Sequence, residues 1–145
     1  MIVVADASVA LKWFFRDRKG EAHAQPALDL LRGVRDGIVT LWQPPHFVAE
    51  VAAVLAREAP STARRDLDDL LQIEMQVHET REAYARAVHL ATRYRQHVFD
   101  TLYHAVALQT EGALLVSADD RYVRAAGTAG RVMRLAEFRV GEANV

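Results

Sequence analysis

Three aspartates of this chain stand at the starts of expected helices, beside strongly apolar segments. Asp6 and Asp119 each follow a short apolar run, and Asp100 opens the helical pattern that leads into the second of those runs. In open α/β sheets the working site lies beyond the carboxyl ends of the strands, so these carboxylates are expected at one edge. Each also has a second interpretation as a helix N-cap, whose oxygen accepts from free backbone N–H groups. Ser8 likewise has two interpretations: it is a helix cap, or it positions a water or a neighbouring carboxylate.

Glu50 differs from the aspartates because it lies inside an expected helix. It stands three residues after Phe47 and four before Val54, and this spacing places it on or beside the apolar stripe. Removing an unpaired charge from water is costly, so Glu50 needs a partner. Two kinds of partner are open at this point: an arginine in a salt bridge, or a metal ion.

Gathered in one pocket, the four carboxylates would repel one another and raise one another's pKa values. A divalent cation removes that repulsion. The chain contains no cysteine, and oxygen ligands suit a hard ion such as Mg²⁺ or Mn²⁺. These ions keep bound water and bind phosphate oxygens, which indicates phosphodiester or phosphoryl chemistry.

Apolar periodicity predicts strands that alternate with helices along the chain. Strands are expected at 2–5, 38–42, 113–116 and 131–135, with another near 73–78, and helices at 9–14, 22–34, 47–58, 61–72, 80–96, 100–108 and 121–127. Parallel neighbours in a sheet need a crossover connection, and helices provide it. The alternation therefore predicts an α/β sandwich with a mostly parallel sheet.

Composition narrows the class of protein further. With 145 residues, 51% of them hydrophobic, the chain is expected to form one domain over 1–145. The formal charge of −1 excludes a polyanion binder that works through bulk charge. Without cysteine there is no disulfide, zinc ribbon or thiol nucleophile, and no run suits a signal peptide or a membrane span, so a cytoplasmic protein is expected. Neither glycine-rich phosphate-binding motif is present, which argues against a nucleotide cofactor.

Four short segments together resemble a family. Residues 3–8 (VVADAS), 45–50 (PHFVAE), 98–105 (VFDTLYHA) and 115–119 (LVSAD) resemble a PIN-domain ribonuclease, and more narrowly a VapC-type toxin of a type II toxin–antitoxin system. The resemblance covers a core of about residues 2–135. It implies a three-layer α/β/α sandwich with a five-stranded, mostly parallel sheet.

The resemblance also implies which residues form the site. Carried over position by position, the acids that would hold Mg²⁺ or Mn²⁺ and serve catalysis are Asp6, Glu50, Asp100 and Asp119. Asp120 is the alternative to Asp119, and Ser8 and Ser117 match the hydroxyl positions beside the first and last acids. His104, one helical turn after Asp100, is either a second donor at this pocket or a packed histidine. Ala53 stands where many relatives carry asparagine, so one polar contact is missing.

The function expected from both arguments is metal-dependent endonucleolytic hydrolysis of RNA, in which a metal-activated water attacks phosphorus. The resemblance implies a tRNA, rRNA or mRNA substrate, 5′-phosphate and 3′-hydroxyl ends, arrest of translation or growth, a cognate VapB-like antitoxin and a homodimer.

Two other classes compete with this expectation. In a non-catalytic α/β module for protein binding, the acids would be caps and salt bridges. In a phosphatase, Asp6 would be the nucleophile, but such enzymes commonly carry a second aspartate two residues later, where this chain has Ser8.

Overall fold

A five-stranded parallel sheet forms the centre of the computed structural model, which describes residues 1–142. The strand order is β3-β2-β1-β4-β5 and every neighbouring pair is parallel. In chain order the strands are β1 (Ile2–Ala5), β2 (Thr40–Gln43), β3 (Gln76–Val77), β4 (Ala113–Ser117) and β5 (Val132–Arg134). The predicted α/β architecture with a five-stranded parallel sheet is confirmed.

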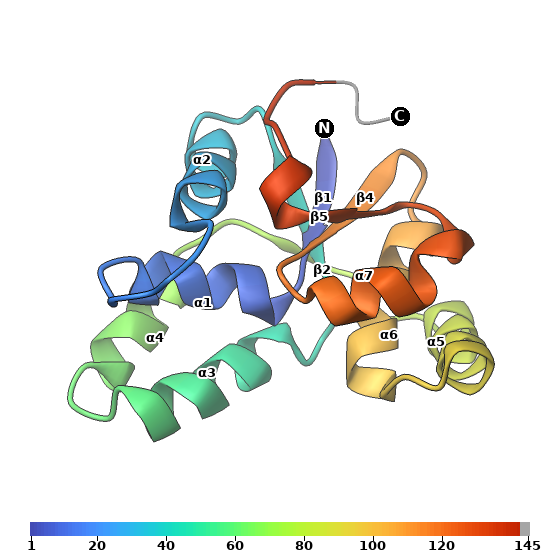
Figure 1. Ribbon diagram of the computed structural model, residues 1–145, viewed down its shortest axis with the longest axis horizontal. Coiled ribbons are helices and arrows are strands. Elements are labelled where there is room, and N and C mark those ends of the chain that lie inside the picture. Colours follow the sequence, from blue (N-terminus) through green and yellow to red (C-terminus); the bar gives the residue numbers. More distant parts are fainter. Residues whose placement is uncertain (143–145) are drawn as a thin grey trace.

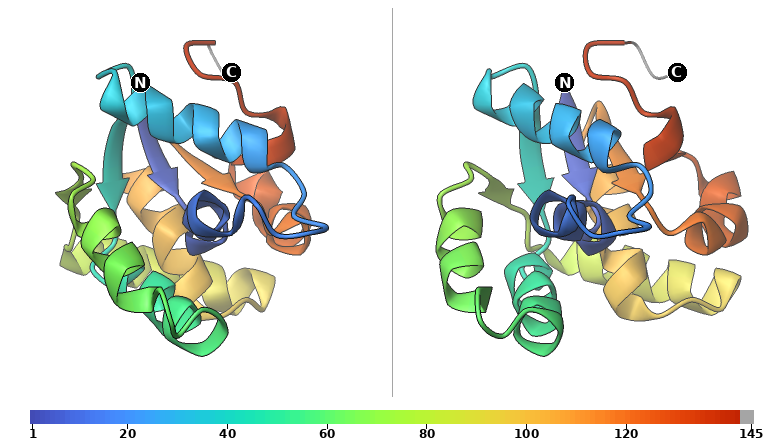
Figure 2. Two further views of the ribbon diagram at one scale, coloured as in Figure 1. Left: turned by 90° about the vertical axis from the view of Figure 1, so that its left-hand side faces the viewer. Right: turned by 60° about the vertical axis from the view of Figure 1, so that its left-hand side comes forward.

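Helices cover both faces of the sheet. They are α1 (Ala7–Phe15), α2 (Ala24–Arg35), α3 (Phe47–Glu58), α4 (Ala63–Leu71), α5 (Arg81–Tyr94), α6 (Val98–Gln109) and α7 (Asp120–Ala126), with short 3₁₀ turns at Gly127–Ala129 and Leu135–Glu137. Figure 1 shows α1 to α4 on one side of the sheet and α5 to α7 on the other, and Figure 2 shows all strands running away from the end that carries the N-terminus. This division follows from right-handed crossovers, because the chain moves to one edge for β2 and β3 and to the other for β4 and β5.

The order of the strands reverses between β1 and β4. Both strands are central and almost fully buried, and they pair over their whole common length, from Ile2↔Ala113 to Ala5↔Val116. Helices that leave their carboxyl ends diverge to opposite faces, and such a switch point is where open α/β sheets commonly bind ligands. Asp6 and Asp119 are the first residues after these two strands that carry a carboxylate.

Two expected boundaries are wrong, each for a local reason. The second strand begins at Thr40 because the backbone N–H groups of Ile38 and Val39 both donate to the carbonyl of Gly33 in a turn. Helix α6 begins before Asp100, because His97 is its N-cap and accepts from the N–H of Phe99 at 3.2 Å. Asp100 therefore lies in the first turn of α6.

The core lies between the sheet and the helices on each face. Its largest fully buried side chains include Trp13, Phe47 and Tyr103, and the indole N–H of Trp13 donates to the carbonyl of Ala27 at 2.8 Å. Burial of these side chains fixes α1, α3 and α6 against the strands; α1 directly follows Asp6, and α3 and α6 carry Glu50 and Asp100. Within residues 1–142, no helix is both long and apolar enough to cross a bilayer.

Candidate active site

Asp6 is held at the carboxyl end of β1 by the residue two positions later. Its Oδ2 accepts from the backbone N–H of Ser8 at 3.0 Å and from the Ser8 hydroxyl. The Ser8 Oγ in turn accepts from the N–H of Ala118 at 3.1 Å. Ser8 therefore joins the turn after β1 to the turn after β4, and it lies beside Asp6 as the sequence suggested.

Gln43 fixes the backbone immediately before Asp6. The pairing of β1 with β2 ends at Val3↔Leu41. Beyond that point, the fully buried side-chain amide of Gln43 makes the hydrogen bonds that a neighbouring strand would otherwise make. Its Oε1 accepts from the N–H of Ala5 at 2.9 Å, and its Nε2 donates to the Ala5 carbonyl at 2.8 Å. Gln43 was not among the residues expected at the site, although a buried glutamine at the end of an apolar strand must find hydrogen-bond partners nearby.

Asp119 is the acid at the end of β4. It is the N-cap of α7, and its Oδ1 accepts from the N–H of Tyr122 at 3.1 Å, while its own N–H donates to Ser117 Oγ at 3.0 Å. Asp120 instead has a side chain 62% exposed, and it pairs with Arg134 at 3.8 Å. The structure therefore brings Asp119, rather than Asp120, toward the other acids, with Ser117 beside it.

Glu50 has two partners, and neither is an arginine. Tyr103 donates its hydroxyl to Glu50 Oε1 at 2.6 Å, and His46 Nε2 lies 3.3 Å from the same oxygen. The salt bridge to arginine that the sequence left open is therefore wrong. Burial raises the pKa of Glu50, but the hydrogen bonds from His46 and Tyr103 outweigh it and hold that pKa below its usual value. Neither partner was expected from the sequence: Tyr103 lies on α6, and His46 directly precedes α3.

Asp100 is the least restrained of the four acids. It is half-buried in the first turn of α6, and its carboxylate forms no hydrogen bond or ion pair with any of residues 1–142. Burial raises its pKa, and the negative charges of Glu50 and Asp119 raise it further, while His97 and His46 oppose the shift. Asp100 thus interacts through charge with Glu50 and Asp119, and its own charge acts on Asp6.

The largest resolved shift among the acids belongs to Asp6. Burial raises the pKa of Asp6 from its usual 3.8 to about 6, against the lowering effect of the Ser8 hydrogen bonds. The charges of Asp100 and Glu50 add to the increase. The repulsion of Asp6 by Asp100 and Glu50, and of Asp100 by Glu50 and Asp119, indicates that the four acids lie near one another at the carboxyl edge of the sheet.

These residues fit a hard divalent cation in donor type and in charge. All four supply carboxylate oxygens, which Mg²⁺ and Mn²⁺ prefer. Within residues 1–142, no three or more histidine, aspartate or glutamate side chains lie in an arrangement that could by itself hold a metal ion. Mg²⁺ usually takes one or two carboxylates and completes its shell with water, so an open set of acids matches its coordination habits.

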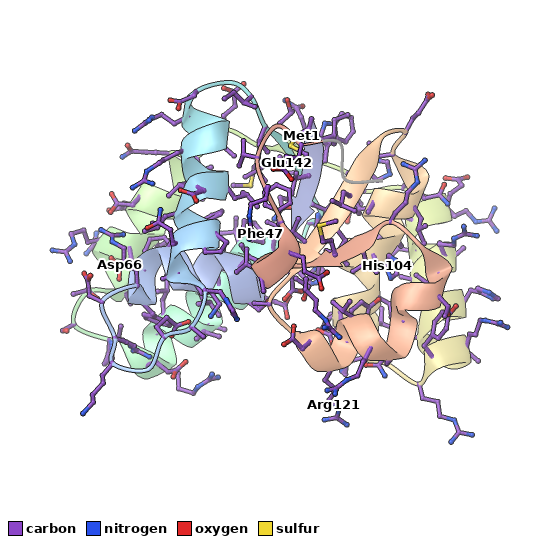
Figure 3. The ribbon with its side chains drawn as sticks, turned by 45° about the horizontal axis from the view of Figure 1, so that its top comes forward. Met1, Phe47, Asp66, His104, Arg121 and Glu142 are labelled. Carbon is purple, nitrogen blue, oxygen red and sulfur yellow. The ribbon has the colours of Figure 1, made fainter. Side chains whose placement is uncertain are left out.

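His104 does not serve this rim. Its Nδ1 lies 2.9 Å from the hydroxyl of Tyr122, and its Nε2 lies 2.7 Å from the carbonyl of Gly130. Burial lowers its pKa, and it lies under the turn that precedes β5 (Figure 3). The expectation that His104 is a donor at the acidic site is corrected: both ring nitrogens have partners elsewhere, so it is a packed histidine.

A cavity of about 590 Å³ lies elsewhere, between α2 and α4. Its lining includes Leu28, Leu31 and Ile73, with Arg32 and Asp69 at its edge. None of the four acids lines it. The four acids therefore lie at the carboxyl edge of the sheet, away from this cavity.

Comparisons with known proteins agree with this architecture. A family model described as PIN domain matches residues 3–128. The fold is shared by VapC20 of Mycobacterium tuberculosis, a Sarcin-Ricin loop cleaving toxin, with a TM-score of 0.64 and 18% identity over 90% of this chain and 96% of that one. VapBC2 of Rickettsia felis, bound to a promoter DNA fragment, has a TM-score of 0.63 and 16% identity over 92% of this chain and 98% of that one. VapBC-1 of nontypeable Haemophilus influenzae has a TM-score of 0.62 and 13% identity over 94% of this chain and 100% of that one. A search of curated proteins gave no match.

Proposed function

The chain belongs to the PIN domain family, and from that premise we propose that it is a divalent-metal-dependent endoribonuclease. One observation supports this most directly. Three of the acids each use a single oxygen for contacts within the protein: Asp6 Oδ2, Glu50 Oε1 and Asp119 Oδ1. Asp100 uses neither oxygen within residues 1–142. Each anchored carboxylate is thus oriented by one oxygen while the other remains available to a ligand.

The residues that would hold the ion are Asp6, Asp100 and Asp119, with Glu50 beside them. When bound, a divalent ion supplies a water of lowered pKa and stabilises the charge that develops on the phosphate. Ser8 restrains Asp6 and links the two strand ends that position the acids. Tyr103 and His46 orient Glu50 and keep it ionised at neutral pH, since they lower its pKa. Its Oε2 is then an acceptor for a proton from water.

The substrate and the partners follow from the structural neighbours. VapC20 is described as a Sarcin-Ricin loop cleaving toxin, and we propose a structured or single-stranded tRNA, rRNA or mRNA as substrate here. The proposed role is the toxin of a toxin–antitoxin pair that arrests translation or growth. A VapB-like antitoxin would inhibit it by placing a basic side chain among the carboxylates, where the charges are complementary. We further propose a single domain over 1–145 that acts as a homodimer in the cytoplasm.

A non-catalytic protein-binding module is the alternative, and specific contacts favour it. Asp6 and Asp119 are real N-caps, and Glu50 has protein partners. Asp100 is the exception, because it caps no helix and pairs with no residue among 1–142. A purely structural role leaves the burial and repulsion at Asp100 unexplained, since an unpaired charge there costs stability.

The test uses the purified protein, its Asp100→Asn variant and an Asp68→Asn control, whose aspartate is exposed on α4. Each is incubated with total cellular RNA in Mg²⁺, Mn²⁺ or EDTA, and new 5′-phosphate ends are sequenced. We expect discrete, metal-dependent ends with wild type and Asp68→Asn, and none with Asp100→Asn. If no ends appear and Mn²⁺ calorimetry also shows no binding that Asp100→Asn weakens, the module replaces the nuclease.

A further inference from the structure

An exposed phenylalanine stands next to the acidic rim. Phe99 directly precedes Asp100, and 55% of its surface is accessible. Its ring lies between two imidazoles, with centroid distances of 5.5 Å to His46 and 4.9 Å to His97. We call these three side chains, His46, Phe99 and His97, the aromatic rim.

The aromatic rim is joined to the site by His46. The same ring nitrogen, Nε2, lies 3.3 Å from Glu50 Oε1 and 2.8 Å from the carbonyl of Phe99. One imidazole therefore separates Phe99 from the carboxylate of Glu50. A group that packs against Phe99 would therefore lie no more than about one nucleotide away from the acids.

The backbone of Phe99 is fixed on both sides. Its N–H donates to His97 Nδ1 at 3.2 Å, and its carbonyl accepts from His46 Nε2 at 2.8 Å. Neither bond uses the Phe99 side chain. The ring is thus held in place by its neighbours while it remains half exposed, and such preorganisation reduces the entropy lost when a ligand is bound.

Resting on the nuclease function proposed above, we propose that the aromatic rim binds a nucleobase of single-stranded RNA, packed against Phe99, beside the phosphate at the acids. Aromatic side chains that stack bases are the general means of holding single strands without strong sequence preference. The chain needs such contacts, because a net charge of −1 and a rim of four carboxylates give little attraction for a polyanion.

The surroundings of Phe99 favour a base over a protein surface. A protein interface has an apolar core that excludes charged groups. Here the ring is bordered by two imidazoles, and the next residue along the helix is the charged Asp100. Flat rings with polar edges match a nucleobase, which has a π-face and a hydrogen-bonding edge.

The test measures binding without cleavage. Fluorescein-labelled oligouridylate and the same oligonucleotide with its bases removed are titrated, in Ca²⁺ and with intactness checked on gels, against wild type, Phe99→Ala, Phe99→Leu and Phe99→Trp. Leu71→Ala on α4 is the control, since Leu71 is 60% exposed. We expect Phe99→Ala and Phe99→Leu to lose about tenfold in affinity for oligouridylate, the size of one base–aromatic stack, with Phe99→Trp and Leu71→Ala near wild type. Affinity for the abasic strand should stay unchanged.

Several outcomes would overturn the proposal. These are equal affinity of wild type and Phe99→Ala, full retention by Phe99→Leu, an equal loss for the abasic strand, or no binding by wild type. A changed sedimentation coefficient of Phe99→Ala with unchanged RNA affinity would assign the aromatic rim to a second copy of the chain instead. If metal-dependent cleavage persists in any of these cases, the base site alone fails and the nuclease function remains.

Discussion

Replacing Asp6 with asparagine is expected to stabilise the protein at neutral pH while it abolishes cleavage. The folded-state pKa of about 6 exceeds the usual 3.8, and about two pKa units correspond to about 3 kcal/mol of unfolding free energy. Partial access of the Asp6 residue to solvent reduces this to about 2 kcal/mol. Asparagine is as good an N-cap as aspartate, so the bond from the N–H of Ser8 survives. We expect the melting temperature to rise by about 6 °C.

The sign of the pH dependence is specific to a raised pKa. Below pH 3.8 the Asp6 carboxyl is protonated in both the folded and the unfolded chain, so it carries no penalty. As pH rises through about 6, the folded chain must ionise a buried group, and the stability that protonated Asp6 contributed is lost. The advantage of Asp6→Asn should therefore be present at about pH 7.5 and mostly absent at about pH 4.

The assay is urea unfolding in EDTA at both pH values, with exposed Asp68→Asn as the matched control. EDTA is needed because a bound cation would neutralise the repulsion and remove the gain. A gain of equal size at both pH values would show that ionisation is not its cause. Destabilisation at about pH 7.5 would refute the reasoning and make Asp6 a structural cap.

Three further predictions follow from the contacts around the rim. Gln43→Leu leaves the N–H and carbonyl of Ala5 without partners, so the free energy of unfolding from urea curves should fall by about 3 kcal/mol. Tyr103→Phe removes a hydrogen bond that lowers the pKa of Glu50, so the acidic limb of the pH–rate profile should move to higher pH, and an unmoved limb would show that Glu50 does not titrate in the reaction. Mn²⁺ should raise the melting temperature of wild type more than that of Asp100→Asn, and equal shifts would exclude Asp100 as a ligand.

Local sequence signals predicted the elements that carry the acids. The apolar stripe of α3 gave its bounds, Phe47–Glu58, and the apolar runs before Asp6 and Asp119 marked β1 and β4. Because ligands bind beyond the carboxyl ends of the strands in open α/β sheets, Asp6 and Asp119 were expected at the same edge. The start of α6 was missed, because a histidine that caps through its ring nitrogen is less common than an aspartate cap.

The tyrosine partner of Glu50 could not be found from the sequence. Tyr103 is 53 residues away in the chain, and its hydroxyl meets Glu50 only because α6 packs beside α3 in the folded molecule. His46 is close in sequence, but its bond to the Phe99 carbonyl also spans 53 residues. Such contacts depend on how helices cross a sheet, and periodicity within one helix does not encode that geometry.

A helix cap and a catalytic acid are compatible roles for one carboxylate. A carboxylate has two oxygens, and a cap needs only one. Asp6 and Asp119 give one oxygen to helix N–H groups, and this bond holds the second oxygen in a fixed direction. Asp100 lacks such an anchor, so it can move toward whatever cation the others bind. Burial is the main cause of the raised pKa of Asp6, and the charges of Asp100 and Glu50 add to it. A divalent ion would neutralise that added repulsion, so part of the stability lost without the ion should be regained when it binds.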